Sequence, residues 1–497
     1  MLDYEDADAV GLAQAVRAGE VSPLELVDAA IQRIEARDSV YNAVVRRTFE
    51  QAREAAQGAL PDGPLRGVPY LLKDLHVAVR GEPTGAGTKL RATQPLDYDS
   101  RMVERLRAGG LVVLGRTNTP ELGLMAITES KLYGPARNPW DPEHTPGGSS
   151  GGAGAAVAAR YVPAAHASDG GGSIRIPASH CGLVGLKPTR GRTPLGPAVG
   201  EGWGGLSIEH AVTRTVRDCA ALLDITRGPE PGAPYQVRAP ERPYLEEVDR
   251  DPGTLRVAVV LESWVAGEND AEVVAAAEAT ARLVQGLGHQ VDVISSPLDA
   301  DAMRAAYFAC VAAALSASVL ETAAAAGRPA RPADFEVTTW TFHKIGGALS
   351  ARELEQHRRV MHRAGLTWAR ELAPYDVVLT PTCARPPAKV GELYPDASKE
   401  RLMSLFRVPG ATPVLLSAVD GIAAQALGAT PNTQIANMLG LPAISLPLWW
   451  APSGLPVGLQ FIAHFGREDI LFRLAAQLEK AQPWAHRRPD LAPVEAP

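Results

Sequence analysis

Two serines lie in glycine-dense segments about two dozen residues apart. Ser149 belongs to the segment PGGSSGG at 146–152, and Ser173 belongs to DGGGSIRIP at 169–177. Glycine is dense where the backbone must turn sharply or approach another group closely. A serine in such a setting suggests a nucleophile with exposed backbone amides around it. Hydrolases use this combination of groups.

Three glycines directly precede Ser173. Such a run lets several backbone N–H groups point into one concavity, where they stabilise a developing negative charge. The sequence therefore predicts an oxyanion hole at Gly170, Gly171 and Gly172, with Ser173 placed to attack a carbonyl above it. A merely flexible glycine loop is the alternative, which the stiff sequel IRIP at 174–177 disfavours.

Lys73 ends a hydrophobic segment, 68–72, that reads as a short buried strand. Burial disfavours the ammonium form and lowers the pKa of a lysine, which turns it into a usable base. A surface lysine at a strand end fits the local sequence equally well.

Other motifs near the serines are weaker. Residues 147–151 match G-x-S-x-G, but that nucleophile elbow needs a preceding strand, and three prolines within 137–146 indicate a loop. A partial dinucleotide fingerprint at 152–157 ends in Val157 instead of glycine, so close packing at a helix start is favoured. A Ser-His-Asp triad would need a histidine with an acidic partner. The histidines near the motifs have no acidic partner at a suggestive spacing. They are His76, His144, His166 and His180.

The elements that must position these residues alternate between strands and helices. A capping box with proline predicts a helix from Ser22 onward, and 100–107, 151–160, 271–287 and 469–481 also read as helices. Strands are expected near 67–74, 111–115, 255–261, 289–294, 376–379, 443–448 and 457–462. The pattern predicts an α/β fold with a mostly parallel or mixed sheet. We expect one domain over 1–497, in which 182–205 is a loop-rich cover over the site and 229–253 is a surface excursion.

Composition excludes several classes of function. The net charge is -7 and no Lys/Arg run exceeds a pair, which argues against a nucleic-acid partner. The acidic N-terminus lacks the apolar region of a signal peptide, and we expect no apolar run long enough to span a bilayer. The four cysteines are far apart and form no CxxC pair, which is typical of reduced thiols. We therefore expect a cytoplasmic protein without a metal or a membrane partner.

Taken together, these residues resemble the amidase signature family. The resemblance covers essentially the whole chain, with a signature core at about 60–220. It is carried by 66–74, 114–121, 137–140, 147–156, 168–178, 182–188, 440–447 and 483–489.

The resemblance implies an amidase signature fold, a mixed twisted β-sheet core flanked by α-helices, and a Ser–cis-Ser–Lys triad. By motif, Ser173 is the nucleophile, Ser149 the bridging serine after a cis peptide bond, and Lys73 the base. The backbone amides of Gly170, Gly171, Gly172 and Ser173 would form the oxyanion hole. Supporting roles fall to Ser150, Asp169 and Arg175.

The implied enzyme cleaves carboxamide C–N bonds through an acyl-enzyme and needs no cofactor. Many family members carry threonine, isoleucine or alanine where this chain has Gly170. The chain is most similar to broad-specificity bacterial amidases of the 6-aminohexanoate cyclic dimer hydrolase type, to aryl amidases and to urethane-cleaving members. The substrate is then a small-molecule amide, anilide, lactam oligomer or carbamate, and a homodimer stays open.

Two alternatives stay open beside this one. The A subunit of glutamyl-tRNA amidotransferase, a glutaminase, is similar through the same triad. A catalytically inactive binding protein of the family is disfavoured because all three triad residues are present. Specificity is expected from about 300–425, chiefly 301–349 and 401–424. Residues there fit either an apolar pocket or ordinary core: Tyr307, Cys310, Trp340 and Phe342.

Overall fold

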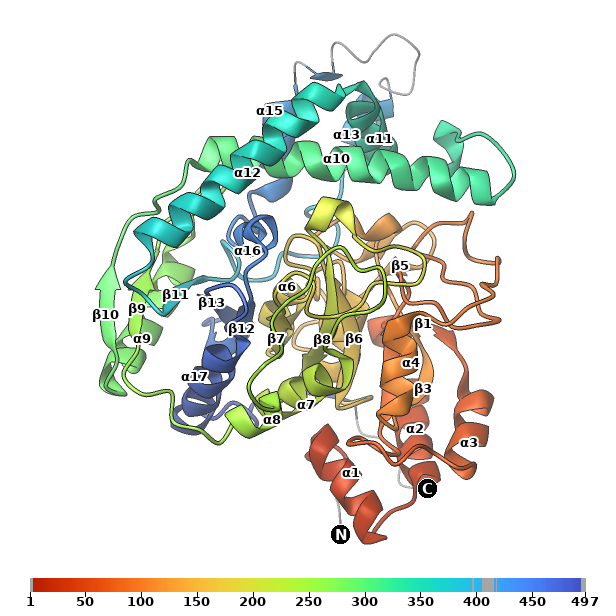
Figure 1. Cartoon of the computed structure of the whole chain (residues 1–497). Helices are drawn as coiled ribbons and strands as arrows, with labels where there is room; N and C mark the ends of the chain where they lie inside the picture. Colours follow the sequence, from red (N-terminus) through yellow and green to blue (C-terminus); the bar gives the residue numbers. More distant parts are fainter. Residues whose placement is uncertain (1–2, 396, 405–414, 417, 493–497) are drawn as a thin grey trace.

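A mixed β-sheet forms the centre of the computed structural model, with helices on both sides (Figure 1). The structure describes residues 3–395, 397–404, 415–416 and 418–492. Within them the main sheet has 11 strands in the order β1-β3-β2-β6-β8-β7-β12-β13-β11-β9-β10, and β4 pairs with β5. The strands are β1 (Val44–Arg47), β2 (Pro69–Lys73), β3 (Val112–Thr117), β4 (Glu129–Ser130), β5 (Gly134–Pro135), β6 (Ala164–Asp169), β7 (Val184–Lys187), β8 (Ile208–Thr213), β9 (Arg256–Val259), β10 (Gln290–Val293), β11 (Val377–Pro381), β12 (Ala443–Trp450) and β13 (Pro456–Ala463).

Helices connect and cover these strands. Ser22 caps α2 with a reciprocal bond to Glu25, as its capping box predicts. The helices are α1 (Ala9–Ala18), α2 (Pro23–Tyr41), α3 (Phe49–Gln57), α4 (Arg101–Ala108), α5 (Gly151–Ala158), α6 (Arg175–Cys181), α7 (Val216–Thr226), α8 (Tyr244–Glu247), α9 (Ala271–Gly286), α10 (Ala300–Ala325), α11 (Val337–Ala348), α12 (Ala351–Glu371), α13 (Ala397–Ser404), α15 (Val419–Leu427), α16 (Gln434–Leu439) and α17 (Glu468–Ala481). Short 3-10 turns lie at η1 (Glu121–Gly123), η2 (Trp203–Gly205) and η3 (Pro332–Asp334).

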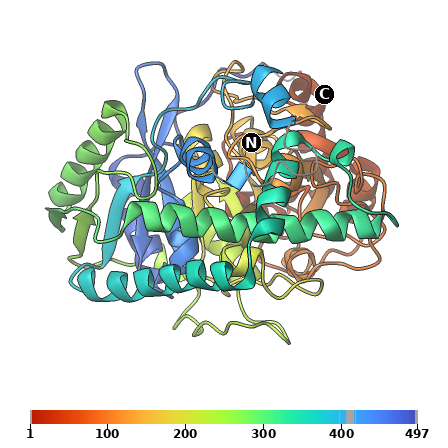
Figure 2. The same ribbon diagram turned by 90° about the horizontal axis from the view of Figure 1, so that it is seen from above.

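The sheet is mixed, as the sequence predicts. β2 runs parallel to β3 and β6, whereas β6 runs antiparallel to β8. The predicted βαβ unit is confirmed, because β9 and β10 pair in parallel and α9 connects them. Helices α10, α11 and α12 pack together across one end of the strands (Figures 1 and 2).

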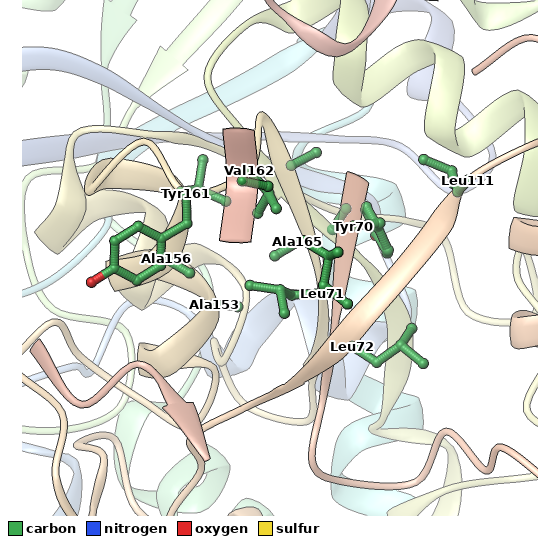
Figure 3. Packing of buried hydrophobic residues seen from close by; sticks show 14 of the residues in the cluster. Tyr70, Leu71, Leu72, Leu111, Ala153, Ala156, Tyr161, Val162 and Ala165 are labelled. Carbon is green, nitrogen blue, oxygen red and sulfur yellow. The ribbon is translucent and has the colours of Figure 1, made fainter. Parts of the chain in front are cut away.

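The core beside the site is built from small side chains. Ala153 and Ala156 of α5 lie next to Leu71 of β2 and Ala165 of β6 (Figure 3). Every residue of α5 is buried. Because glycine and alanine add little bulk, the helix backbone lies close to the sheet and fixes the segment that precedes it.

The structure refines two expectations and corrects a third. The segment 182–205 is not all loop, since it contains the buried strand β7 and the turn η2. The segment 229–253 is anchored: Tyr244 is buried against Phe472, with ring centroids 5.4 Å apart. By length and composition α10 could cross a bilayer, contrary to expectation, although core helices of soluble proteins pass the same test and more than half of its apolar stretch is buried. Of the expected specificity segment 401–424, residues 405–414 and 417 lie outside the described residues.

Candidate active site

Lys73 is the last residue of β2, and it lies where two parallel strands end together. Leu71 of β2 faces Ala165 of β6, so the register brings Lys73 beside the end of β6. The Lys73 Nζ donates to Ser149 Oγ at 2.7 Å and to Ser168 Oγ at 2.9 Å. The strand register thus brings together a lysine and a serine that are 76 positions apart in the sequence.

Burial favours the neutral form of the Lys73 amine. Its side chain is completely buried. Desolvation lowers the pKa of Lys73 to about 7, against the opposing effect of the nearby Glu209 and Asp169 carboxylates. The alternative of a surface lysine is excluded. At neutral pH a large fraction of this amine carries a free lone pair.

Ser149 is held by the loop that precedes α5. The peptide bond between Gly148 and Ser149 is cis. Thr128 brackets the turn, because its hydroxyl donates to Gly147 O at 2.9 Å and accepts from Gly151 N at 3.1 Å. No strand precedes Ser149, so the nucleophile-elbow motif has no structural counterpart here.

Ser150 supports the end of β6 rather than the amine directly. Its hydroxyl donates to Ser168 O and accepts from Ser168 N, each at 3.3 Å. This pair of bonds fixes the backbone of Ser168, whose side chain is the second partner of Lys73. Ser168 was not singled out from the sequence, although it lies within a recognised motif.

A buried histidine and glutamate lie behind the lysine, and sequence reasoning missed their pairing. His166 Nε2 and Glu209 Oε2 are 2.6 Å apart on the neighbouring strands β6 and β8. The backbone N–H of Lys73 donates to His166 Nδ1 at 3.4 Å. Burial opposes ionisation of Glu209, but His166 and Lys73 hold its pKa below the usual value. Only the strand pairing brings these residues together, so no local signal could have found them.

The glycine loop presents free backbone donors. Within the described part of the chain, the N–H groups of Gly170, Gly171 and Ser173 have no hydrogen-bond partner. The Gly172 N–H instead donates to Asp169 Oδ1 at 2.7 Å, and the Ile174 N–H donates to Asp169 Oδ2 at 3.1 Å. The predicted donor set is therefore divided: Gly172 is already occupied, while its neighbours are free.

Asp169 and Arg175 hold this loop in place through an ion pair. Both are fully buried, and Arg175 binds both carboxylate oxygens at 2.8 and 3.0 Å. Burial opposes ionisation of Asp169, but Arg175 outweighs it and keeps the pKa of the carboxyl well below its usual range. Distant residues complete the network through hydrogen bonds to the pair: Thr433, Asn437 and Gln460.

Ser173 differs from the residues around it in its exposure to solvent. Every residue from 145 to 181 is buried except Ser173, which is partly exposed. Its hydroxyl makes no hydrogen bond within the described residues, so the structure joins Lys73 to Ser149 but leaves Ser173 Oγ unpaired. A hydroxyl that is both accessible and unpaired is free to meet a substrate.

Aromatic rings explain why the loop contains glycines. A Cβ at residue 170 would lie 2.7 Å from Trp203 Cε3, and one at residue 171 would lie 1.8 Å from Tyr307 Oη. Trp203 therefore occupies the space that a side chain at Gly170 would need. Tyr307 Oη also donates to Gly170 O at 3.4 Å. The other expected pocket residues are buried in the same hydrophobic cluster: Cys310, Trp340 and Phe342.

The other residues considered from the sequence take no part in the hydrogen bonds of Lys73 Nζ. The described residues contain no group of His, Cys, Asp and Glu arranged to hold a metal ion. His180 is buried beside Gly147, and His144 pairs with Asp141 on the surface of the loop. The four cysteines are buried and form no disulfide bond.

Comparison with known proteins assigns the chain to a family. The Amidase family model matches residues 25–472. The chain is 38% identical to the 6-aminohexanoate-cyclic-dimer hydrolase of Paenarthrobacter ureafaciens, over 97% of this chain and 96% of that protein. A solved structure of 6-aminohexanoate cyclic dimer hydrolase superposes with a TM-score of 0.88 at 37% identity, covering 99% of each chain. A bacterial aryl acylamidase of the amidase signature family superposes with a TM-score of 0.83 at 26% identity, over 96% of this chain and 97% of that one. This chain is therefore a member of the amidase signature family and a hydrolase that acts on amides.

Proposed function

We propose that the chain hydrolyses amides through an acyl-enzyme formed on Ser173, with Ser149 as the proton relay and Lys73 as the base. The hydrogen bond between the buried side chains of Lys73 and Ser149, from Nζ to Oγ, is the observation that carries the proposal. A buried neutral amine beside one serine, with a second, accessible serine close by in the chain, suits a two-step proton transfer.

The proposed reaction proceeds in two halves. Lys73 takes a proton from Ser149, which takes one from Ser173 as its oxygen attacks the carbonyl carbon. The oxyanion accepts hydrogen bonds from the free N–H groups of Gly170, Gly171 and Ser173. The relay then delivers the proton to the leaving nitrogen, the C–N bond breaks, and an amine departs. Water later attacks the ester by the same route, which releases the carboxylic acid and restores Ser173.

In this proposal Asp169, Arg175 and Ser150 act on position rather than on the substrate. Asp169 holds the Gly172 and Ile174 amides, so the flanking N–H groups stay free. Ser150 holds Ser168 against Lys73. Gly172 therefore contributes to the oxyanion hole by its conformation, with φ at 126°, and its own donor stays on Asp169.

The substrate we propose is a neutral small-molecule amide with an apolar acyl part. Trp203 and Tyr307 lie directly against the glycine loop and provide apolar contact surface there. The similarity to 6-aminohexanoate-cyclic-dimer hydrolase favours lactam oligomers within this class. Carbamates and anilides belong to the same screen, and a cytoplasmic location remains our prediction.

Two measurements test the proposal. Phenylmethylsulfonyl fluoride is expected to inactivate the enzyme, and peptide mapping is expected to find the adduct on Ser173. An adduct on Ser149 would overturn the assignment of the nucleophile. A hydrolysis screen over aliphatic amides, anilides, lactam oligomers, carbamates and glutamine then decides the substrate class, because a clear preference for glutamine would favour the glutaminase alternative.

A further inference from the structure

A cavity of about 260 Å³ lies at the far ends of the two helices that follow the catalytic serines. Helix α5 starts just after Ser149 and ends at Ala158, which lines the cavity. Helix α6 starts just after Ser173 and ends at Cys181, which also lines it. The segment 484–489 also lines the cavity. No step of the proposed hydrolysis uses this region.

The charge of the lining is strongly unbalanced. Four arginines line the cavity, and the only carboxylate among the lining residues is Asp6, which pairs with Arg488. The other arginines are Arg160, Arg214 and Arg487. Clustered guanidinium groups repel one another unless an anion lies between them. The carboxylates of Glu5, Asp8 and Asp218 also act on Arg160 or Arg214, but they do not line the cavity, so guanidinium groups are the main charges that a ligand inside it would meet.

Arg160 is the most informative member of this cluster. It is 8% exposed, and its Nη1 donates to the backbone oxygen of Glu5 at 3.2 Å. Its Nε is buried and has no partner within the described residues. Burial, and then the charges of Arg214 and Arg488, lower the pKa of Arg160 to about 9. A buried donor without a partner is costly. The neighbouring Nη2 also makes no hydrogen bond within the described residues, so the edge formed by Nε and Nη2 is free.

The backbone at Arg160 also points to a use for its side chain. Its φ is +63°, in the left-handed region just after the end of α5. Helices usually place glycine or asparagine at that position. An arginine there pays a conformational cost, which is reasonable where the guanidinium itself is needed.

Tryptophans give the cavity apolar walls. The Trp140 Nε1 donates to Cys181 O at 2.8 Å, and the Trp484 Nε1 donates to Arg214 O at 2.9 Å. Both indole N–H groups are therefore used by the protein, and the rings remain as apolar surface. An inorganic anion would gain nothing from such walls, whereas an organic anion would bury its hydrocarbon part against them.

We propose that this cavity binds a small organic carboxylate, with the carboxylate on the free edge of Arg160 and the hydrocarbon part against Trp140 and Trp484. A guanidinium edge matches a carboxylate in two parallel hydrogen bonds. Amide hydrolysis releases compounds of this chemical class, so the ligand would be produced wherever the enzyme acts.

Crystals soaked in 4-iodobenzoate provide the first test, because the iodine locates the ligand. Iodine density between Arg160 and the tryptophans is the expected result. Density confined to the surroundings of Ser173, or no density, would overturn the proposal.

Titration calorimetry with benzoate provides the second test. Arg160→Asn suits the left-handed backbone, so it removes the guanidinium with little strain. It is expected to lower the association constant of benzoate by about tenfold or more and to leave the hydrolysis rate unchanged. Arg487→Ala, on the exposed segment, is expected to weaken binding as well, while Arg359→Ala on the exposed face of α12 is the matched control. Unchanged affinity in Arg160→Asn, or inorganic phosphate binding as tightly as benzoate, would refute a carboxylate site.

Discussion

Replacing Lys73 with methionine is expected to stabilise the fold at neutral pH while abolishing activity. Lowering the pKa of this amine from 10.5 to about 7 corresponds to about 5 kcal/mol of unfavourable free energy as long as the folded amine keeps its proton, at pH values below the folded pKa. Methionine has nearly the same length and no charge to desolvate. The loss of hydrogen bonds to Ser149 and Ser168 costs about 1 kcal/mol each, so a net gain of roughly 2 kcal/mol is expected at pH 7.

The pH dependence is the diagnostic part of this prediction. Between pH 7 and 10.5 the unfolded chain holds a proton on Lys73 that the folded chain lacks, so wild-type stability rises with pH. The unfavourable free energy falls from about 4 kcal/mol at pH 7 to about 2 kcal/mol at pH 9. The advantage of Lys73→Met should therefore shrink by about 2 kcal/mol over this range.

Urea unfolding followed by circular dichroism at pH 7 and pH 9 measures this change. Lys480→Met is the control, because the side chain of Lys480 is 69% exposed on α17. Its stability difference from the wild type should not depend on pH. If the difference between Lys73→Met and the wild type is equal at both pH values, the amine is not desolvated and the reasoning fails.

Three further outcomes follow from the site. The kcat/KM for p-nitroacetanilide is expected to rise with pH around a midpoint near 7, reaching about a tenth of its plateau at pH 6; a flat profile from pH 6 to 9 contradicts a titrating Lys73. Gly171→Ala is expected to lower kcat about 100-fold or more, because its Cβ would lie 1.8 Å from Tyr307 Oη. Adding Tyr307→Phe should restore part of the lost kcat. Full activity in the single variant would show that the loop adapts. Asp169→Asn removes the carboxylate of a buried pair with Arg175 and is expected to lower the free energy of unfolding by about 3–5 kcal/mol, measured in urea; a loss below about 1 kcal/mol argues against bracing.

Local sequence signals predict the parts of the fold that depend on neighbouring residues. The capping box at Ser22, the alanine-rich α5 and the unit β9-α9-β10 are all present, because caps and hydrophobic periodicity act over a few residues. Strand β7 is hidden in the sequence, since it is only four residues long and lies in a glycine- and proline-rich segment. Its burial comes from its neighbours β8 and β12 in the sheet, which no local pattern reveals.

In the candidate site, too, local signals are visible in the sequence and contacts from distant segments are not. The glycines before Ser173 are visible in the sequence, and so is the hydrophobic strand that ends at Lys73. The groups that complete the site come from far along the chain: Glu209 through the pairing of β6 and β8, and Tyr307 through the packing of α10. Sequence spacing does not encode those contacts. The Gly172 donor was likewise expected to be free, because the turn that directs it to Asp169 depends on three-dimensional geometry.

In the proposed mechanism Ser173 is the residue of the stretch 145–181 that solvent reaches, because the rest of this stretch is buried. Lys73 and Ser149 are buried, so in the proposed mechanism their protons would be exchanged through the Ser173 hydroxyl. In the proposed acyl-enzyme the amine and the incoming water would use the same face, so the amine must leave first. The expected kinetics are therefore ping-pong, and an added amine that enters before water would intercept the acyl group and form a new amide. The enzyme would thus work as an acyltransferase whenever nucleophilic amines outcompete water for the acyl group on Ser173.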